Sequence, residues 1–293
     1  MKEDIKDNEI RVIGLDSGIK PNGIVRLLGK IIISILLIIT AVTAVYFISS
    51  GPSHPEPEIG IYDPTPEPPS DAHPLCAWLS QHDSLPGITG CAIKDTLVND
   101  IMVRIYLPVN ARPALCIGTR PLNDDNVILA FQAADIRADN KKIVGAFVEK
   151  GKPLAWGLSK KGYCAILHDS IYIGMADNTS LFEQATDCDG YFFRQYPLVS
   201  NHIPQSSELK TQTIRRALCE AEGRTVVIET HDRAGMHDFA VLLADLGVSN
   251  AIYLIGSDAM GTVTDLSGNR TTVGDNVKKR YKNINFIYWT KAN

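Results

Sequence analysis

The predicted fold rests on a stretch that reads TVVIET at 225–230, HDFAVLLADL at 237–246 and AIYLI at 251–255. In its central segment, apolar residues recur at i, i+3, i+4 and i+7, which places one apolar stripe along a helix (Phe239, Leu242, Leu243 and Leu246). Asp238 lies in the first turn, where a negative charge suits the helix dipole, and Gly247 is placed to end the helix. The flanking segments are short and rich in β-branched residues, so they predict strands. Such a strand–helix–strand unit commonly pairs its strands in parallel.

Other short runs rich in β-branched and aromatic residues predict further strands. They are Ile101–Leu107, Val127–Ala133, Ile143–Glu149, Tyr163–Leu167 and Asn285–Trp289. The segment EKGK at 149–152 predicts the tip of a hairpin. Together these elements predict an α+β fold, a mixed β-sheet with packed helices.

Composition excludes several classes of protein. The chain has 293 residues, 45% hydrophobic and 21% charged, with a formal net charge of −4. A disordered chain would have fewer apolar residues and more net charge. A binder of duplex nucleic acid usually has a basic excess, so no nucleic-acid partner is expected.

One apolar run predicts a membrane anchor. Residues 31–48 (IIISILLIITAVTAVYFI) carry no charge, and with Leu27 and Leu28 the run is long enough to span a bilayer as a helix. A buried core helix is the alternative, but no polar face interrupts the run. A cleaved signal peptide is another; its apolar region would be shorter and nearer the start, although Ser49, Ser50 and Gly51 offer small residues for cleavage. We expect an uncleaved signal anchor over 27–48.

The charges around this anchor predict its orientation. Arg26 and Lys30 precede the apolar run, and no Lys or Arg follows it until Lys94. The positive-inside rule then keeps a tail, residues 1–26, in the cytoplasm and exports the rest to the periplasm or the cell exterior. Residues 49–70 are rich in proline and predict an extended linker, and 71–293 form a single exported domain. All six cysteines lie in that domain, where Cys76 and Cys91 are the first candidates for a disulfide.

Candidate site residues lie at the ends of predicted strands. Polar side chains after the strand near Ala133 (Asp135, Arg137 and Asp139) read equally as a solvated turn. Arg194 and Gln195, beside Tyr196 in an apolar run, suit an anion site or an ion pair with a carboxylate. Arg215 and Arg216 are adjacent, so at most one of them faces a given pocket. Arginine suits phosphate through its bidentate fork, and a surface ion pair is the alternative.

Acid–base candidates follow the strand at 225–230. Glu229, His231, Asp232 and Asp238 lie between a strand and a helix N-terminus, with Arg233 and His237 beside them. Carboxylates and imidazoles can act as acids or bases near neutral pH, although a merely polar loop would have the same composition. Gly256 and Ser257 form a predicted tight turn after the strand at 251–255. No metal-ligand motif is present, and no cofactor is expected.

Several of these segments, in this order, resemble the phosphodiester glycosidase family, the domain of the lysosomal uncovering enzyme and its bacterial relatives. The resemblance spans roughly residues 126–265. The segments that carry it are LAFQAAD at 129–135, VGAFVEKGK at 144–152, QYPLV at 195–199, Arg215, DFA at 238–240 and LIGS at 254–257. The family's Asp in its Leu-Asp-Gly-Gly turn is Ile255 here, and its Asn in Asn-Ala-Gly is Gln132.

The resemblance implies a membrane-anchored hydrolase that cleaves a sugar-1-phosphodiester. It implies that Arg215, with Arg194, holds the phosphate, that Gln195, Gly256 and Ser257 contact the substrate, and that Glu229, His231, Asp232 and Asp238 supply the acid–base groups. The alternative is a catalytically degenerate module that binds a phosphorylated envelope glycan, which Ile255 favours because its side chain cannot ionise. A third possibility is a tether whose exported domain binds another protein through an apolar patch.

Overall fold

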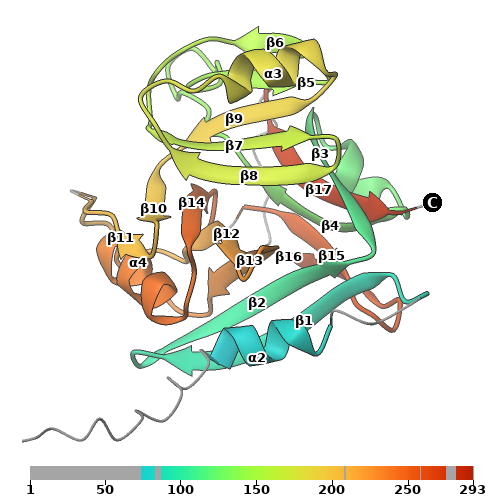
Figure 1. The fold of residues 1–293 in the computed structure, drawn as a ribbon, viewed down its shortest axis with the longest axis vertical. Helices are drawn as coiled ribbons and strands as arrows, with labels where there is room; N and C mark the ends of the chain where they lie inside the picture. The colour runs from blue at the N-terminus through green and yellow to red at the C-terminus, as the bar shows by residue number, and fades with distance from the viewer. Residues whose placement is uncertain (1–73, 83–86, 208, 258, 275–281, 293) are drawn as a thin grey trace, which may run out of the picture. The chain divides into compact units, whose positions relative to one another are not determined.

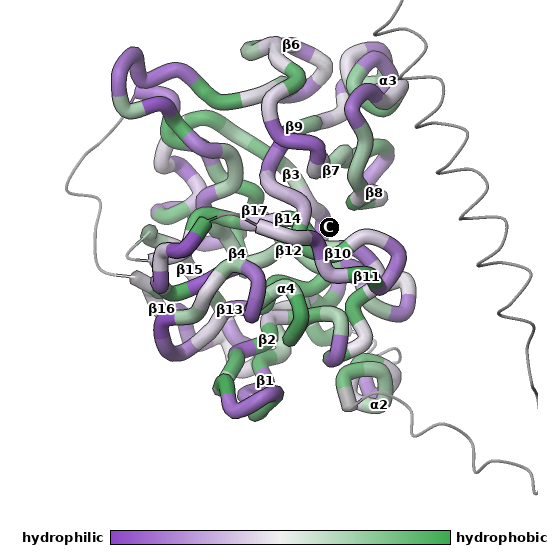
Figure 2. The backbone as a smooth tube through the Cα atoms, turned by 90° about the vertical axis from the view of Figure 1, so that its left-hand side faces the viewer, coloured by the Kyte–Doolittle hydropathy of each residue, from purple (hydrophilic) through white to green (hydrophobic). Residues whose placement is uncertain are grey.

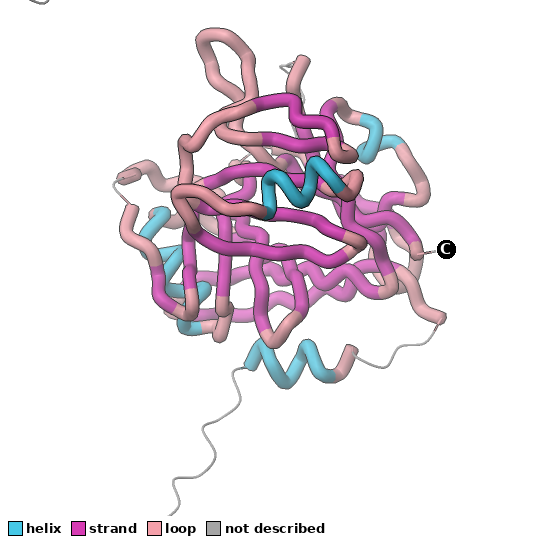
Figure 3. Tube along the Cα trace, turned by 45° about the horizontal axis from the view of Figure 1, so that its top comes forward, coloured by secondary structure: helices cyan, strands magenta, loops and turns pink. Residues whose placement is uncertain are grey.

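The computed structural model describes residues 74–82, 87–207, 209–257, 259–274 and 282–292. The predicted tail, anchor and linker, residues 1–70, lie outside these ranges. Within the ranges, no helix is both long enough and apolar enough to cross a bilayer. Strands are the main regular structure of the described chain, as Figures 1 and 3 show.

The largest sheet has seven strands. Their order is β1 (Gly90–Val98), β2 (Ile101–Val109), β13 (Arg224–Thr230), β12 (Arg216–Ala221), β14 (Asn250–Leu254), β10 (Pro197–Ser200) and β11 (Ile203–Pro204). α4 (Met236–Asp245) packs on one face of it, and α2 (Pro74–Ser80) contributes to the same core.

Two five-stranded sheets complete the fold. The second sheet has the order β16 (Arg270–Val273), β15 (Gly261–Thr264), β4 (Val127–Gln132), β17 (Asn285–Lys291) and β3 (Ala111–Ile117). The third has the order β6 (Lys152–Ala155), β5 (Phe147–Glu149), β9 (Tyr191–Gln195), β7 (Gly162–Leu167) and β8 (Ser170–Met175). α3 (Leu181–Asp187) lies on the third sheet, and a 3-10 turn, η1 (Arg120–Asn123), precedes β4.

The predicted fold class, α+β with a mixed sheet and packed helices, is wrong. All strand pairs in the described ranges are antiparallel, with one isolated parallel bridge between Cys91 and Asp265. β13 and β14 do flank α4 and run in the same direction, but β12 lies between them and pairs with both. The protein is therefore mainly antiparallel β, with few and short helices.

Tight turns explain why antiparallel pairing dominates. Five two-residue loops join neighbouring strands, and both residues of each loop have positive φ. That is the type I′ geometry, whose twist matches the twist of the two strands. The loops are Asn99–Asp100, Lys150–Gly151, His168–Asp169, Asn201–His202 and Glu222–Gly223. The hairpin predicted at EKGK is thereby confirmed.

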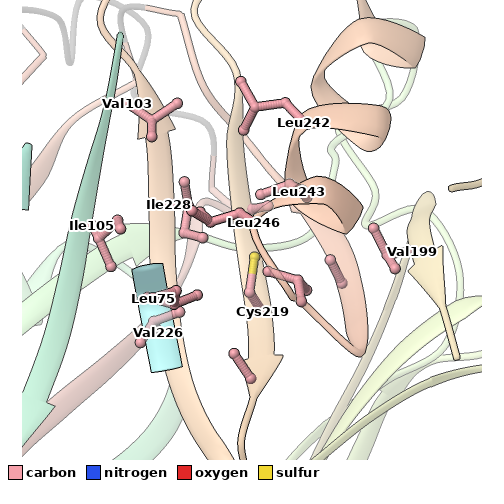
Figure 4. Packing of buried hydrophobic residues seen from close by; sticks show 14 of the residues in the cluster. Leu75, Val103, Ile105, Val199, Cys219, Val226, Ile228, Leu242, Leu243 and Leu246 are labelled. Atoms are coloured by element: carbon pink, nitrogen blue, oxygen red, sulfur yellow. The ribbon is translucent and has the colours of Figure 1, made fainter. Parts of the chain in front are cut away.

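The predicted helix is confirmed within one residue at each end. α4 follows Gly235, carries Asp238 in its first turn and ends before Gly247, whose φ is +94°. Its apolar stripe is fully buried against β12, β13 and β2 (Figure 4). Burial of one such leucine side chain stabilises the fold by roughly 1.5–3 kcal/mol. In Figure 2 this helix is coloured mainly as apolar.

A second core lies on the opposite face of the large sheet, among all three sheets. Tyr106, Leu218 and Ile252 reach it from the large sheet, Phe131 from the second and Phe193 from the third. All six cysteines are free thiols. The expected Cys76–Cys91 disulfide is absent from the described ranges, because the Cys76 thiol contacts Glu222 and Cys91 is buried in the second core.

Candidate functional site

A row of four charged residues crosses the large sheet where the second core ends. Asp95 on β1 is opposite Arg104 on β2, which is opposite Glu229 on β13, which is opposite Arg216 on β12. Residues directly opposite one another in antiparallel strands point to the same face of the sheet. The row therefore alternates in sign across one face, and each charge has an oppositely charged neighbour.

Arg216 and Glu229 form the buried part of this row. Arg216 donates from Nε and Nη2 to the Glu229 carboxylate, and their side chains are 1% and 12% exposed. Nη1 of Arg216 donates to the Ile255 carbonyl at 2.8 Å, and the guanidinium lies 4.1 Å from the centre of the Phe131 ring. These contacts fix the position of the Glu229 carboxylate, because a buried ion pair holds only with good geometry.

Asp95 lies between Arg104 and His231. Arg104 donates from Nε and Nη2 to the two Asp95 oxygens, both at 2.7 Å, and His231 Nε2 is 3.2 Å from Oδ1. The hydrogen bonds from Arg104, and then that to His231, hold the pKa of Asp95 below its ordinary value. His231 is thereby oriented by a carboxylate, an arrangement typical of imidazoles that transfer protons.

A cavity of about 270 Å3 opens beside this row. Its polar lining comes from β2, β12, β13 and the turn after β14: Arg104, Arg216, Glu229, Thr230, His231 and Ser257. Ile214, Val273 and Gly274 are the other described residues that line it. Of the predicted site residues, the structure thus brings Glu229, His231 and Ser257 together.

The turn after β14 has no room for larger residues. Gly256 is buried, and a Cβ there would lie 2.3 Å from the Ile214 carbonyl oxygen. The Gly256 amide donates to the Tyr253 hydroxyl at 3.3 Å, and the Ser257 amide donates to Ile214 O at 2.9 Å. Ser257 has a φ of +58° and lines the cavity. Gly256 therefore lies beneath the site and Ser257 at its edge.

Gln195 belongs to a second polar cluster. Its Oε1 accepts from Lys160 Nζ at 2.8 Å, and its Nε2 donates to Ala133 O at 3.1 Å. Lys160 also pairs with Asp135 and lies 4.2 Å from the centre of the Tyr196 ring. Burial lowers the pKa of Lys160, and the nearby Asp135 carboxylate opposes that shift.

Hydrogen bonds to the end of β4 connect this second cluster with the turn that carries Ser257. The Gln132 carbonyl accepts the Ile255 amide at 3.2 Å, and the next carbonyl, of Ala133, accepts from Gln195. Gln195 is linked to this turn through β4, but it does not line the cavity.

Arg194 and Arg215 are both held by backbone carbonyls. Arg194 is 2% exposed and donates to the carbonyl oxygens of three residues (Lys160, Ala176 and Asp177), while its Nε has no described partner. Arg215 donates to the Ala234 and Thr211 carbonyls. It points to the face of the sheet opposite Arg216, as expected for adjacent residues of a strand. Neither lines the cavity, and Arg216 is the arginine of that pair which does.

Asp232 and Asp238 are exposed, and neither lines the cavity. His237, the other histidine of this loop, is also exposed. Asp232 contributes its carbonyl oxygen, which accepts from the Thr230 hydroxyl at 2.7 Å. Among the described residues there is no group of three or more His, Cys, Asp or Glu side chains arranged to hold a metal ion.

Asp95 and Arg104 are the site residues that sequence reasoning missed. A usable signal is the Asn99–Asp100 turn: counting back and forward from it pairs Asp95 with Arg104. Nothing local in the sequence pairs β13 with β2, which are far apart along the chain, so the alignment of Arg104 with Glu229 needed the structure.

No family model matches the chain, and no curated protein matches its sequence. Among solved structures it is similar to the catalytic domain of zebrafish N-acetylglucosamine-1-phosphodiester alpha-N-acetylglucosaminidase, auto-inhibited by its pro-peptide, with a TM-score of 0.47 and 13% identity over 71% of this chain and 85% of that one. It is also similar to a hypothetical protein from Synechocystis, with a TM-score of 0.46 and 11% identity over 71% of this chain and 64% of that one. These are distant similarities of fold, and no residue role is carried over from them.

Proposed function

We propose that the cavity beside Glu229 binds a sugar-1-phosphodiester and hydrolyses its glycosidic bond. One observation carries the proposal: Glu229, His231 and Ser257 share a cavity with Arg104 and Arg216. A cavity with a carboxylate, an imidazole and cationic side chains suits a substrate that has both an acetal carbon and a negative charge.

The departing phosphate needs little acid catalysis from the protein. Water adds to the anomeric carbon, and the electron pair of the breaking C–O bond leaves with the phosphate. A phosphate monoester is a good leaving group, since its second pKa is about 6, so no strong acid is needed. In this scheme Glu229 stabilises the positive charge that develops on the sugar, and His231 accepts the proton of the attacking water. Arg104 attracts the phosphate.

The second candidate function is binding without turnover. It is favoured by how fully the polar groups are engaged: Arg216 neutralises Glu229, and Arg215 is committed to carbonyls. Ile255, at the position of the family's Asp, donates its amide to Gln132 and accepts from Arg216 through its carbonyl, so only backbone groups act there. Such a module recognises a phosphorylated glycan of the cell envelope.

The proposal includes a single-pass membrane protein with a cytoplasmic N-terminus. Its support is the uncharged run at 31–48 and the basic residues before it. The folded region then works in the periplasm or at the cell exterior, tethered near an envelope substrate. Protease accessibility of residues 71–293 from the outer side of intact cells tests this part.

A hydrolysis assay separates the two candidates. The purified protein is incubated with a panel of sugar-1-phosphodiesters, and free reducing sugar is measured alongside binding. Hydrolysis that His231→Gln slows by about 100-fold or more supports the enzyme, since general acid–base groups contribute on that scale. Binding that Arg104→Gln weakens, without hydrolysis by wild type, supports the binding module. A protein that neither binds nor cleaves any member of the panel contradicts both.

A further inference from the structure

A second cavity lies away from the charged row, beside the edge strand β6. Its volume is about 520 Å3, within the usual range for small-molecule sites. Its described lining comes from the end of β3, the loop before β5, the end of β6 with the residue after it, and the segment before β17: Ile117, Lys142, Ile143, Leu154, Ala155, Trp156 and Asn283. It shares no lining residue with the cavity at Glu229.

Trp156 is the unusual member of this lining. Its side chain is 71% exposed, whereas Trp289 is 3% exposed and Trp78 packs against the α4 core. An exposed indole presents a large flat apolar face with a donor at one edge, and such rings are enriched at binding surfaces. The other apolar walls, Ile143 and Leu154, pack against the second core, so the cavity has a fixed back.

Two described residues of this lining have polar side chains, Lys142 and Asn283, and only the lysine is charged. Lys142 is exposed, and no acidic residue is among the described residues that line the cavity. Asn283 donates from Nδ2 to the Lys141 carbonyl at 2.8 Å, which orients the amide and leaves its oxygen as an acceptor. A ligand that fits has an apolar face for the indole, hydroxyl donors for Asn283 and a negative charge for Lys142.

We propose that this cavity binds an anionic sugar, with one ring stacked on Trp156 and its carboxylate or phosphate next to Lys142. A pyranose ring has a face of C–H bonds that covers an indole, while its hydroxyls reach polar groups at the side. A concave site suits a small ring better than a protein surface, because protein partners usually bury flatter areas of about 800 Å2 per side.

Titration of the full-length protein tests this proposal. The protein is held in a zwitterionic detergent, because a sugar headgroup would compete for the site. The probes are glucuronic acid, glucose 6-phosphate and glucose, and binding is followed by saturation-transfer NMR with Kd from titration. Both anionic sugars are expected to bind more tightly than glucose. Comparison with glucose tests the need for a negative charge, and comparison of glucuronic acid with glucose 6-phosphate tests whether carboxylate or phosphate is preferred.

Three variants assign the binding to this cavity. Trp156→Ala is expected to weaken the anionic sugars by about tenfold or more, as for an aromatic anchor. Lys142→Gln is expected to reduce their affinity to that of glucose. Leu158→Ala is the matched control, since Leu158 is 68% exposed and does not line the cavity. A Glu229→Gln variant keeps this binding, so the proposal stands or falls separately from hydrolysis.

Several results overturn the proposal. One is the absence of binding by all three sugars, and another is equal affinity for glucose and the anionic sugars. Wild-type affinity in Trp156→Ala, whose fold is checked by its thermal transition, also overturns it. A further contradicting result would come from sedimentation. If the wild type binds no sugar but self-associates, and Trp156→Ala abolishes that self-association, the face around Trp156 is a contact between two copies of the chain.

Discussion

Glu229 and Arg216 lie directly opposite each other on β13 and β12, and the arginine donates two hydrogen bonds to the carboxylate at the edge of the second core. A buried charge that loses its oppositely charged partner destabilises the folded protein. We expect Arg216→Met to lower the free energy of unfolding by roughly 3–5 kcal/mol. Urea denaturation measures the change.

The double variant Arg216→Met/Glu229→Leu is its control. With both charges removed, no buried charge is left unpaired, so the double variant should recover much of the stability that the single variant loses. A double variant as unstable as Arg216→Met would mean that lost packing, rather than an unpaired carboxylate, dominates the effect.

Asp95 predicts a dependence of stability on pH. Its pKa is lower in the folded protein than its ordinary value of 3.8, mainly through the hydrogen bonds from Arg104. The contribution of this carboxylate is therefore present above pH 3.8 and is lost as the pH falls through the lower folded value. We expect Asp95→Asn to flatten the acid limb of a plot of unfolding midpoint against pH. Arg104→Gln should have the same effect, and an unchanged acid limb in both would refute the assignment.

Arg194 is predicted to act structurally, through its three carbonyl contacts. A lysine has one ammonium group and cannot reproduce the planar fork that reaches them. Arg194→Lys should therefore lower the free energy of unfolding by about 2 kcal/mol, because at least one buried carbonyl loses its donor. Thermal unfolding in buffers with and without phosphate checks this. Strong stabilisation by phosphate that disappears in Arg194→Lys would instead make Arg194 an anion-binding residue.

Gly256 tests the packing beneath the cavity. A Cβ there would lie 2.3 Å from the Ile214 carbonyl oxygen, so Gly256→Ala must move the backbone next to Ser257. We expect a loss of about 1–3 kcal/mol, as for other overpacked sites. Gly223→Ala is a useful comparison, because that glycine has positive φ but open space around it and tests strain without collision. Equal losses in the two variants would remove the steric explanation.

Sequence reasoning found the elements better than their arrangement. The stripe from Phe239 to Leu246 identified α4 because a helix of this kind has a local period, and short apolar runs identified strands such as β4 and β13. The parallel pairing of β13 with β14 failed because β12 lies between them. Most of the type I′ turns escaped notice, since dipeptides such as His168–Asp169 and Glu222–Gly223 lack the usual Asn-Gly signal.

For the candidate site too, the sequence identifies residues better than it predicts which of them lie together. Glu229, His231 and Ser257 were found from their places at strand ends, and the structure brings them to one cavity. Arg215 was preferred to Arg216 on a family resemblance, although the two point to opposite faces and only Arg216 lies opposite Glu229. Which of two adjacent side chains faces a site depends on strand register, and that register is set by pairing across the whole sheet.

The most direct test of the proposed function is the rate of sugar release by wild type and by Glu229→Gln. The glutamine keeps the shape of the side chain and can still accept from Arg216, but it leaves the buried guanidinium without a counter-charge. The fold of the variant is therefore checked by its thermal transition, and its ligand binding by titration, before the rates are compared. The account predicts release of free sugar from a sugar-1-phosphodiester by wild type, and a rate at least about 100-fold lower in Glu229→Gln with Kd nearly unchanged. Equal rates of release by the two proteins would contradict a reaction at Glu229.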